Sequence, residues 1–313
     1  MDRHALAFLT PTDAPRWKRW LVYSPLARIV IFAVLLALAS TLASLVLRDL
    51  GWLAKGTTPL QRGLAEFLAR AAPALAAYLL LVRWVERRRP SELSLRALAP
   101  YGLAGLAAGT VLFSAIVGAL WLAGSYHVVG TNPHANWLPA LLMVGLGAGI
   151  GEEIICRGVL FRIVEEGLGT WVALGVSALF FGGAHLANPG ATLWSSAAIA
   201  IEAGILFGLL YHVTRSLWLC MGLHTAWNFM QGTVYGIPVS GTRADGWLVS
   251  TRSGPDWLSG GVFGAEASVV ALGLCLLVSA GLLAQALRRR LPVPPLPRRA
   301  LAAAPLPPSL PDR

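Results

Sequence analysis

Eight long runs of apolar residues dominate this sequence and restrict the folds open to it. By run length they cover approximately 29–47, 64–84, 101–123, 137–164, 170–189, 193–213, 216–236 and 266–287. About 20 apolar residues cross the hydrocarbon core of a bilayer, and a backbone at that depth must satisfy its hydrogen bonds internally, as a helix does. The sequence therefore predicts an all-α fold, a polytopic membrane helix bundle with about eight transmembrane helices.

The composition agrees with a membrane protein. Of the 313 residues, 56% are hydrophobic and 13% are charged, whereas about 25% of the residues in a soluble domain are charged. The net charge of +10 is carried mainly by the connections between apolar runs, so we expect a lipid bilayer as the partner and no nucleic acid. The three cysteines all lie in apolar runs and are expected to be small buried residues.

Lys and Arg are shared unequally between the two sides of this predicted bundle. Of the 25, all but six fall on the side that holds both chain ends. The six on the other side are Arg48, Lys55, Arg62, Arg70, Arg243 and Arg252. The positive-inside rule then predicts that both termini are cytoplasmic. The chain is rich in Ala, Leu and Arg, which is typical of bacterial proteins, so we expect it in the bacterial cell (inner) membrane.

The predicted ends of the first and last apolar runs divide the chain into three parts. Residues 1–28 form a cytoplasmic N-terminal segment, residues 29–287 form the transmembrane bundle, and residues 288–313 form a Pro-rich, disordered cytoplasmic tail. The glycine-rich connection 237–265 is long for a helix bundle, so we expect it to cap the bundle on the outer side. Gly204 and Gly208, four residues apart, predict close helix packing in the sixth run.

Three short strings place ionisable groups inside the apolar runs. They are Glu152-Glu153-Ile154-Ile155-Cys156-Arg157, Phe181-Gly182-Gly183-Ala184-His185 and His224-Thr225-Ala226-Trp227-Asn228. Such groups are costly at bilayer depth and usually face a cavity or a partner, so each of them needs a reason.

The first string separates two glutamates. Glu153 and Arg157 are four residues apart on one helix face, where they can form an ion pair that offsets the cost of burial. Such a pair is more often structural than catalytic, so we assign Glu153 and Arg157 a supporting role. Glu152 points about 100° away from Glu153 and has no partner in the helix, which suits a general base.

The other two strings add imidazoles and a carboxamide. His224 and Asn228 are four residues apart and can face one cavity, and His185 lies at a depth where it can join them. Together with Glu152, these groups can activate water, stabilise an oxyanion and protonate a leaving amine. A packing role for His185 and an interhelical hydrogen bond for His224 and Asn228 are the simpler alternatives. Glu202 either faces the cavity or pairs with a cation such as Arg157.

At these residues the sequence resembles the CPBP family of intramembrane endopeptidases, the CAAX protease and bacteriocin-processing or Abi family. Its pattern is EExxxR, FxxxH and HxxxN on successive helices, matched here by Glu152, Glu153 and Arg157, by Phe181 and His185, and by His224 and Asn228. The similarity extends over about 83–285, where Arg89-Pro90-Ser91-Glu92-Leu93 resembles the stretch before the family domain. Any one motif is weak, but three in register are specific.

The resemblance implies a membrane cavity with defined roles. Glu152 would be the base, His185 would help to activate water, and His224 and Asn228 would lie near the oxyanion. The resemblance leaves the metal open. The sequence lacks the HExxH spacing, and we predict a mechanism that requires no cofactor. If a divalent metal such as zinc takes part instead, Glu152, His185 and His224 are its expected ligands.

The sequence thus predicts an intramembrane endopeptidase that is CAAX-protease-like and metalloprotease-like. It would hydrolyse a peptide bond of a membrane-associated protein or peptide. The alternative is a non-catalytic membrane binding protein, either an immunity-type factor or a transporter-like bundle. Binding alone does not need the four polar residues together, and no internal repeat of the transporter kind is visible.

Overall fold

The structure is a computed structural model that describes residues 6–297 and 299. Within that part of the chain it is mostly helical, with a single two-stranded sheet, which confirms the predicted all-α polytopic bundle. Six continuous helical segments are long and apolar enough to cross a membrane: Pro25–Asp49, Pro59–Val85, Leu95–Leu122, Trp137–Leu168, Leu193–Thr214 and Val269–Arg288. The predicted count of eight is not confirmed: α8 has only 16 residues, and the continuous helix of α11 and η6, Leu217–Val234, is not among the six.

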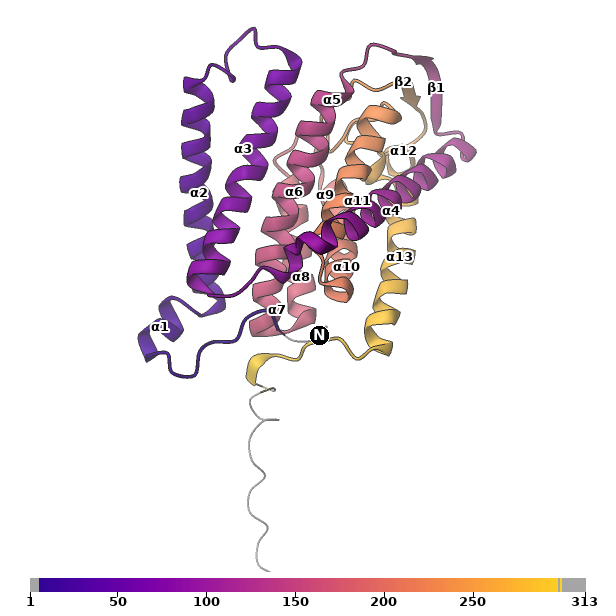
Figure 1. Cartoon of the computed structure of the whole chain (residues 1–313). Coiled ribbons are helices and arrows are strands. Elements are labelled where there is room, and N and C mark those ends of the chain that lie inside the picture. Colours follow the sequence, from indigo (N-terminus) through magenta and orange to yellow (C-terminus); the bar gives the residue numbers. More distant parts are fainter. Residues whose placement is uncertain (1–5, 298, 300–313) are drawn as a thin grey trace, which may run out of the picture.

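The elements follow one another along the chain in an order that Figure 1 labels. They are α1 (Arg16–Leu21), α2 (Pro25–Asp49), α3 (Pro59–Leu80), η1 (Leu81–Val85), η2 (Ser91–Leu93), α4 (Leu95–Leu122), β1 (Tyr126–Thr131), α5 (Trp137–Ala140), η3 (Leu141–Gly147), α6 (Ala148–Glu153), η4 (Ile154–Phe161), α7 (Arg162–Leu168), α8 (Thr170–His185), α9 (Leu193–Ile199), η5 (Ala200–Ile205), α10 (Leu206–Thr214), α11 (Leu217–Phe229), η6 (Met230–Val234), β2 (Leu248–Arg252), α12 (Asp256–Ser259), η7 (Ala265–Ala267) and α13 (Val269–Arg288).

Side-chain caps mark where several of these helices begin. Ser24 accepts a hydrogen bond from the N–H of Ala27, and Pro25 follows it at the first helical position. Thr58 and Gln61 form a capping box at the start of α3, and Thr192 does the same with Ser195 at α9. These groups satisfy N–H donors that a helix end leaves without partners, so the sequence itself sets these starts.

Of the five π-helical segments among the described residues, η1 continues α3, and the other four lie in the helices that surround the cavity. They are η3, η4, η5 and η6. The segments η3 and η4 flank Glu152 and Glu153, η5 contains Glu202, and η6 follows Asn228 by one residue. A π-segment widens a turn and redirects the side chains around it, and it occurs often at functional sites.

Glycines set the distance between the inner helices. A Cβ built at Gly105 of α4 would lie 2.3 Å from the carbonyl oxygen of Leu219 in α11, and one at Gly109 would lie 2.5 Å from that of Leu223. The two backbones therefore touch over successive turns, as small residues allow in membrane helices. The predicted close packing at Gly204 is confirmed, because a Cβ there would lie 2.5 Å from the Cα of Ala178 in α8.

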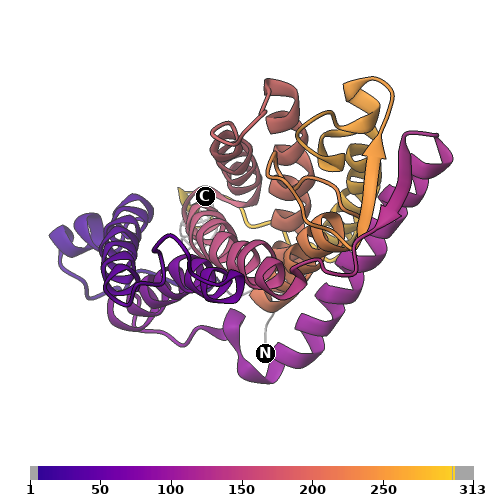
Figure 2. The same cartoon turned by 90° about the horizontal axis from the view of Figure 1, so that it is seen from above.

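The outer elements are arranged around this centre. Figure 2 shows the hairpin of α2 and α3 at one side of the bundle. The strands β1 and β2 pair antiparallel, from Tyr126 with Arg252 to Thr131 with Leu248. In Figure 1 this pair and α12 lie at one end of the bundle, while α1 and the C-terminal end of α13 lie at the opposite end. The loop 237–265 packs onto the bundle, as its apolar residues Ile237, Val239 and Phe263 are buried.

A buried network of charges joins the elements at the α1 end. Arg28 of α2 contacts Glu86 at 2.9 Å and Glu166 at 2.7 Å. Arg162 of α7 contacts the same two carboxylates, at 2.9 and 3.1 Å. Each charge therefore has at least two opposite partners, which compensates for much of its lost hydration. Burial opposes ionisation of Glu86, but Arg162, Arg88 and Arg28 together hold the pKa of its carboxyl below the ordinary value.

The first part of the predicted tail is held against this end of the bundle. The N–H of Val293 donates to the hydroxyl of Thr170 at 2.8 Å, and its carbonyl accepts the N–H of Thr170 at 3.0 Å. Gly169 allows this approach, because a Cβ there would lie 2.7 Å from the carbonyl oxygen of Val293. Val293 and the two prolines after it thus lie beside the start of α8, and the disorder of the tail as a whole stays a prediction. The predicted tail beyond residue 297, apart from Arg299, lies outside the described residues.

The orientation in the membrane can be tested by cysteine labelling of intact cells. Thr251 in β2 and Arg89 before η2 are both exposed and lie at opposite ends of the bundle. We expect Thr251→Cys to react with an impermeant maleimide in intact cells and Arg89→Cys to react only after permeabilisation. The native cysteines Cys156, Cys220 and Cys275 are buried, so their background should be low. The opposite labelling pattern would reverse the predicted orientation.

Stability should depend on pH through Glu92. Burial opposes its ionisation, but Arg88 at 2.7 Å and Arg162 lower the pKa of its carboxyl from 4.5 to about 2. A lowered folded pKa gives stability that is complete above about pH 4.5 and is lost as the pH falls towards 2. The loss amounts to about 3 kcal/mol. We expect the unfolding temperature in detergent to fall over this range, and Glu92→Gln to flatten that dependence. An unchanged pH dependence in Glu92→Gln would refute this assignment.

Candidate active site

The two adjacent glutamates of α6 lie in different surroundings. The side chain of Glu153 is 0% exposed, whereas that of Glu152 is 36% exposed. Because neighbouring side chains on a helix diverge by about 100°, one of them enters the packed interior while the other lines an open cavity. This is the separation that the spacing predicts.

Glu153 binds two partners from different helices. Its Oε1 accepts from Arg157 at 3.0 Å, which is the ion pair predicted from their spacing, and it also accepts from Nδ1 of His224 at 2.8 Å. Since a carboxylate is only an acceptor, Nδ1 of His224 must carry the proton. The other ring nitrogen, Nε2, then lies 4.0 Å from Oε2 of Glu152. The contact between Glu153 and His224 was not predicted from the sequence, since it joins residues that lie far apart along the chain.

Arg157 is also held from its other side. It donates to the carbonyl oxygen of Ala203 in η5, and its guanidinium carbon lies 4.9 Å from the ring centre of Phe181 and 5.1 Å from that of Phe207. These cation–π contacts and the carbonyl replace the hydration that the buried guanidinium has lost. Arg157 therefore does not pair with Glu202, which was one of the two alternatives for that residue.

His185 is oriented by its own helix. Its Nδ1 lies 2.8 Å from the carbonyl oxygen of Phe181, four residues earlier, so Nδ1 carries the proton and Nε2 is left as an acceptor. The ring also packs on that of Phe181, with centres 4.7 Å apart. Phe181 thus fixes both the tautomer and the direction of His185, which gives the FxxxH spacing a physical meaning.

Asn228 is fixed by a carbonyl of a π-segment. Its Nδ2 donates to the carbonyl oxygen of Val144 in η3 at 2.9 Å. A carboxamide nitrogen has two hydrogens, so one remains for a ligand. Asn228 lies one turn after His224 on α11, and both side chains reach the same cavity.

That cavity has a volume of about 430 Å³ and contains all four residues predicted to be catalytic, Glu152, His185, His224 and Asn228. Its walls come from α3, η3, α6, η4, α8, α11 and the loop after η6. Sequence reasoning missed two of the cationic groups on this wall, Arg70 of α3 and Arg243 of the loop. Neither belongs to a motif, and Arg70 had been counted only for its charge.

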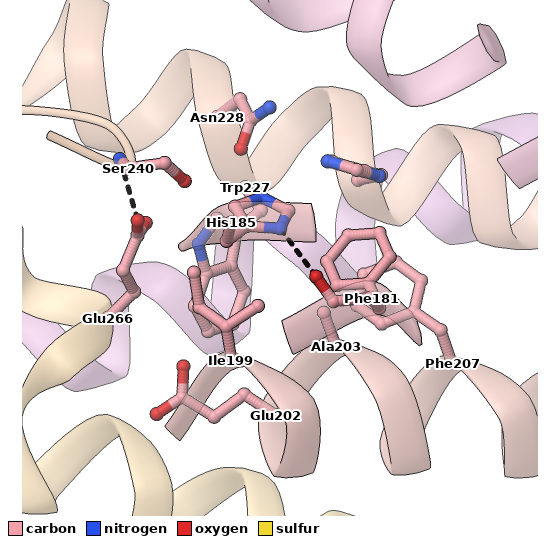
Figure 3. A pocket seen from close by; sticks show the side chains of 11 residues that line it. Phe181, His185, Ile199, Glu202, Ala203, Phe207, Trp227, Asn228, Ser240 and Glu266 are labelled. Carbon is pink, nitrogen blue, oxygen red and sulfur yellow. Dashed lines mark hydrogen bonds between the residues drawn. The ribbon is translucent and has the colours of Figure 1, made fainter. Parts of the chain in front are cut away.

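A second, smaller cavity of about 40 Å³ adjoins the first. Figure 3 shows its lining, with Glu202 and Glu266 on the same side of His185. Glu202 therefore faces a cavity, which was the other alternative for it. Glu266 of η7 was also missed, because it stands at the edge of an apolar run, where a charge is usually solvated. Burial raises the pKa of its carboxyl above the ordinary value.

The donors of the site do not form a metal centre as they are placed. Among residues 6–297 and 299, no three His, Cys, Asp or Glu side chains lie close enough together to hold a metal ion. Nδ1 of His224 and Nδ1 of His185 each donate to an oxygen of the protein, which leaves both Nε2 atoms free, as they are in metal-binding histidines. Zinc needs three or four donors at about 2 Å, so Glu152, His185 and His224 would have to come closer together to bind it.

The fold and the cavity define a class, namely an integral membrane protein of several apolar helices that encloses a polar site. Residues 134–230 match the model of a family described as Rce1-like, type II CAAX prenyl endopeptidase Rce1-like. The matched segment is about a third of the chain and contains all three motifs. It confirms the resemblance to the CAAX proteases. No curated protein and no solved structure matches the chain.

Adjacent Glu→Gln substitutions should separate the two glutamates. Glu153→Gln removes the charge that compensates for Arg157, so we expect a loss of about 3–5 kcal/mol in stability, as for other broken buried pairs. Glu152→Gln should change stability by less than about 1 kcal/mol, since its side chain is partly exposed in the cavity. Thermal unfolding of both purified variants in one detergent measures the difference. If Glu152→Gln is the less stable, the roles given to the two residues are wrong.

Proposed function

We propose that this protein is an intramembrane endopeptidase that hydrolyses a peptide bond of a membrane-associated protein or peptide. One observation carries the proposal. Glu152, His185, His224 and Asn228 line one cavity within the segment that matches the CAAX protease family model. A base, two imidazoles and a carboxamide around a cavity of this size are what peptide hydrolysis by activated water requires.

Glu152 and His185 activate the water molecule. Glu152 reaches the cavity without a salt bridge to Arg157, since that cation is bound by Glu153. Its carboxylate takes a proton from a water molecule, and the oxygen attacks the carbonyl carbon of the substrate. Nε2 of His185, an acceptor in the tautomer that Phe181 selects, accepts a hydrogen bond from the same water and orients it.

Asn228 and His224 stabilise the oxyanion, and Glu152 protonates the leaving amine. The free hydrogen of the Asn228 carboxamide can donate to the oxyanion, and the bond to Val144 holds the group in place beforehand. His224 donates to the same oxygen when its ring carries a second proton, and Glu153 at Nδ1 compensates for that charge. Glu152 then delivers the proton that it took from water to the amine as the C–N bond breaks.

Two further features belong to the proposal. The mechanism uses no metal ion, so activity should survive removal of zinc. The protein lies in the bacterial inner membrane with both termini in the cytoplasm, which places the loop 237–265 on the outer side. Its substrate is a protein or peptide anchored in the same bilayer, because the cavity opens among helices that cross it.

The test is cleavage of a library of membrane-anchored peptides by the protein in lipid nanodiscs. We expect Glu152→Gln to abolish turnover and Asn228→Ala to lower kcat by about 10²–10³-fold with little change in KM, since an oxyanion donor acts mainly in the transition state. Asp49→Asn is the matched control, because it removes an exposed carboxyl at the end of α2.

Chelation on the same preparation tests the absence of a metal. Activity that persists in excess chelator, with no stoichiometric zinc in the protein, is the expected result. One tightly bound zinc per chain that is lost together with activity would refute the metal-free mechanism. If no peptide is cleaved while Glu152→Gln still supports the cellular phenotype, the protein is a binding factor and the enzymatic proposal fails.

A further inference from the structure

The small cavity contains two acidic groups that the catalytic scheme does not use. Glu202 of η5 is 4% exposed and Glu266 of η7 is 3% exposed. Oε1 of Glu202 has no hydrogen-bond partner, although it is shielded from solvent. Glu266 accepts the N–H of Ser240 at 2.6 Å, and the side chains of Ser240, Gln231 and His185 also lie close to its carboxyl.

Arg252 and His185 lie near enough to Glu266 to act on its charge, whereas no cation within residues 6–297 and 299 pairs with Glu202. The salt bridges formed within residues 6–297 involve neither carboxyl. Arg157, which contacts Phe181 and Phe207 of the cavity wall, is bound by Glu153 and by the carbonyl of Ala203. A buried carboxylate such as that of Glu202 is costly without a counter-charge, and a cation beside it relieves that cost.

The rest of the lining selects the kind of cation. Phe181, Phe207 and Trp227 contribute aromatic surface, and Ile199 and Ala203 contribute apolar surface. Aromatic faces together with carboxyls suit an organic ammonium group better than a hydrated metal ion. Donors for a metal are also too few, since no group of three lies close enough within the described part of the chain.

The volume limits the size of that cation. About 40 Å³ is room for roughly three water-sized spheres. An ammonium group with its last methylene units fits such a space, whereas the planar fork of a guanidinium is wider. Three N–H donors on an ammonium also match the carboxylate oxygens in number and compactness.

The small cavity is a side pocket of the large one. The two share Phe181, His185, His224, Asn228 and Ser240 in their walls. A peptide held in the large cavity with its scissile bond near Glu152 can therefore extend a neighbouring side chain past His185 towards Glu202. We propose that Glu202 and Glu266 form a specificity subsite for a lysine side chain beside the scissile bond, an inference that rests on the proposed protease function.

Matched peptides test this subsite. They carry lysine, acetyllysine or norleucine at one position and are otherwise identical, and they are chosen from the sequences that the protein cleaves. We expect the wild type to cleave the lysine peptide at least about 10-fold faster in kcat/KM than the two neutral peptides, because a buried charge pair distinguishes ligands by that much or more. In Glu202→Gln the preference should fall to about 2-fold or less, while Asp49→Asn should retain it.

A binding readout separates this inference from the protease function. n-Butylammonium should raise the unfolding temperature of the wild type, and n-butanol at the same concentration should not. Glu202→Gln should lose the response and be more stable than the wild type without ligand, because it removes an uncompensated buried group. Glu266→Gln serves as a second variant if Glu202→Gln is not produced in folded form.

The outcomes are distinct. Equal cleavage of the lysine and acetyllysine peptides would overturn the subsite and leave the protease function intact. If no peptide is cleaved but n-butylammonium stabilises the wild type and not Glu202→Gln, the ammonium-binding pocket is supported and the protease function is refuted. If n-butylammonium does not stabilise the wild type, the subsite is refuted whatever the result with peptides.

Discussion

The carboxylate of Glu153 is the interaction on which the centre of the structure depends. It is fully buried in an apolar bundle, where Arg157 and His224 both donate to it in place of water. Arg157 in turn contacts Phe181 of α8 and the carbonyl of Ala203 in η5. A single anion therefore orders four segments that meet around the cavity. Glu153 therefore determines both how the segments pack around the site and how charge is distributed within it.

One long helical segment connects this centre to the charge network near α1. Residues Trp137–Leu168 carry Glu152 and Glu153 in the middle and Arg162 near the end, and the end meets Arg28 of α2 through Glu166. The charges of this helix thus lie at two different depths of the bundle. Those in the middle lie around a cavity, whereas those at the end are neutralised by other parts of the chain and leave no comparable space. The π-segments η3 and η4 on either side of α6 turn the glutamates towards their separate surroundings.

Local spacing explains what could be predicted from the sequence. The i,i+4 relations of Glu153 with Arg157 and of His224 with Asn228 are fixed by helix geometry, so their common faces follow from the letters alone. The contact of Glu153 with His224 and the burial of Glu266 arise from tertiary packing and have no local signal. Run length likewise predicts the long helices, but it overestimates α8, because the apolar run there continues into turns, and at α11 the run continues into the π-segment η6. Val293 gave no sign of its pairing with Thr170, because backbone hydrogen bonds are independent of side-chain type.

The contact of α4 with α11 at Gly105 and Gly109 has a consequence for how such a site can evolve. The helix with His224 and Asn228 is located by backbone atoms touching backbone atoms, and no side chain acts as a spacer there. Apolar residues of α4 such as Leu103 and Val111 are exposed and do not line the cavity. They can change with the thickness and composition of the host membrane while His224 and Asn228 keep their places. Gly105 and Gly109 cannot change in the same way, since even one added methyl group would displace the helix that carries His224 and Asn228.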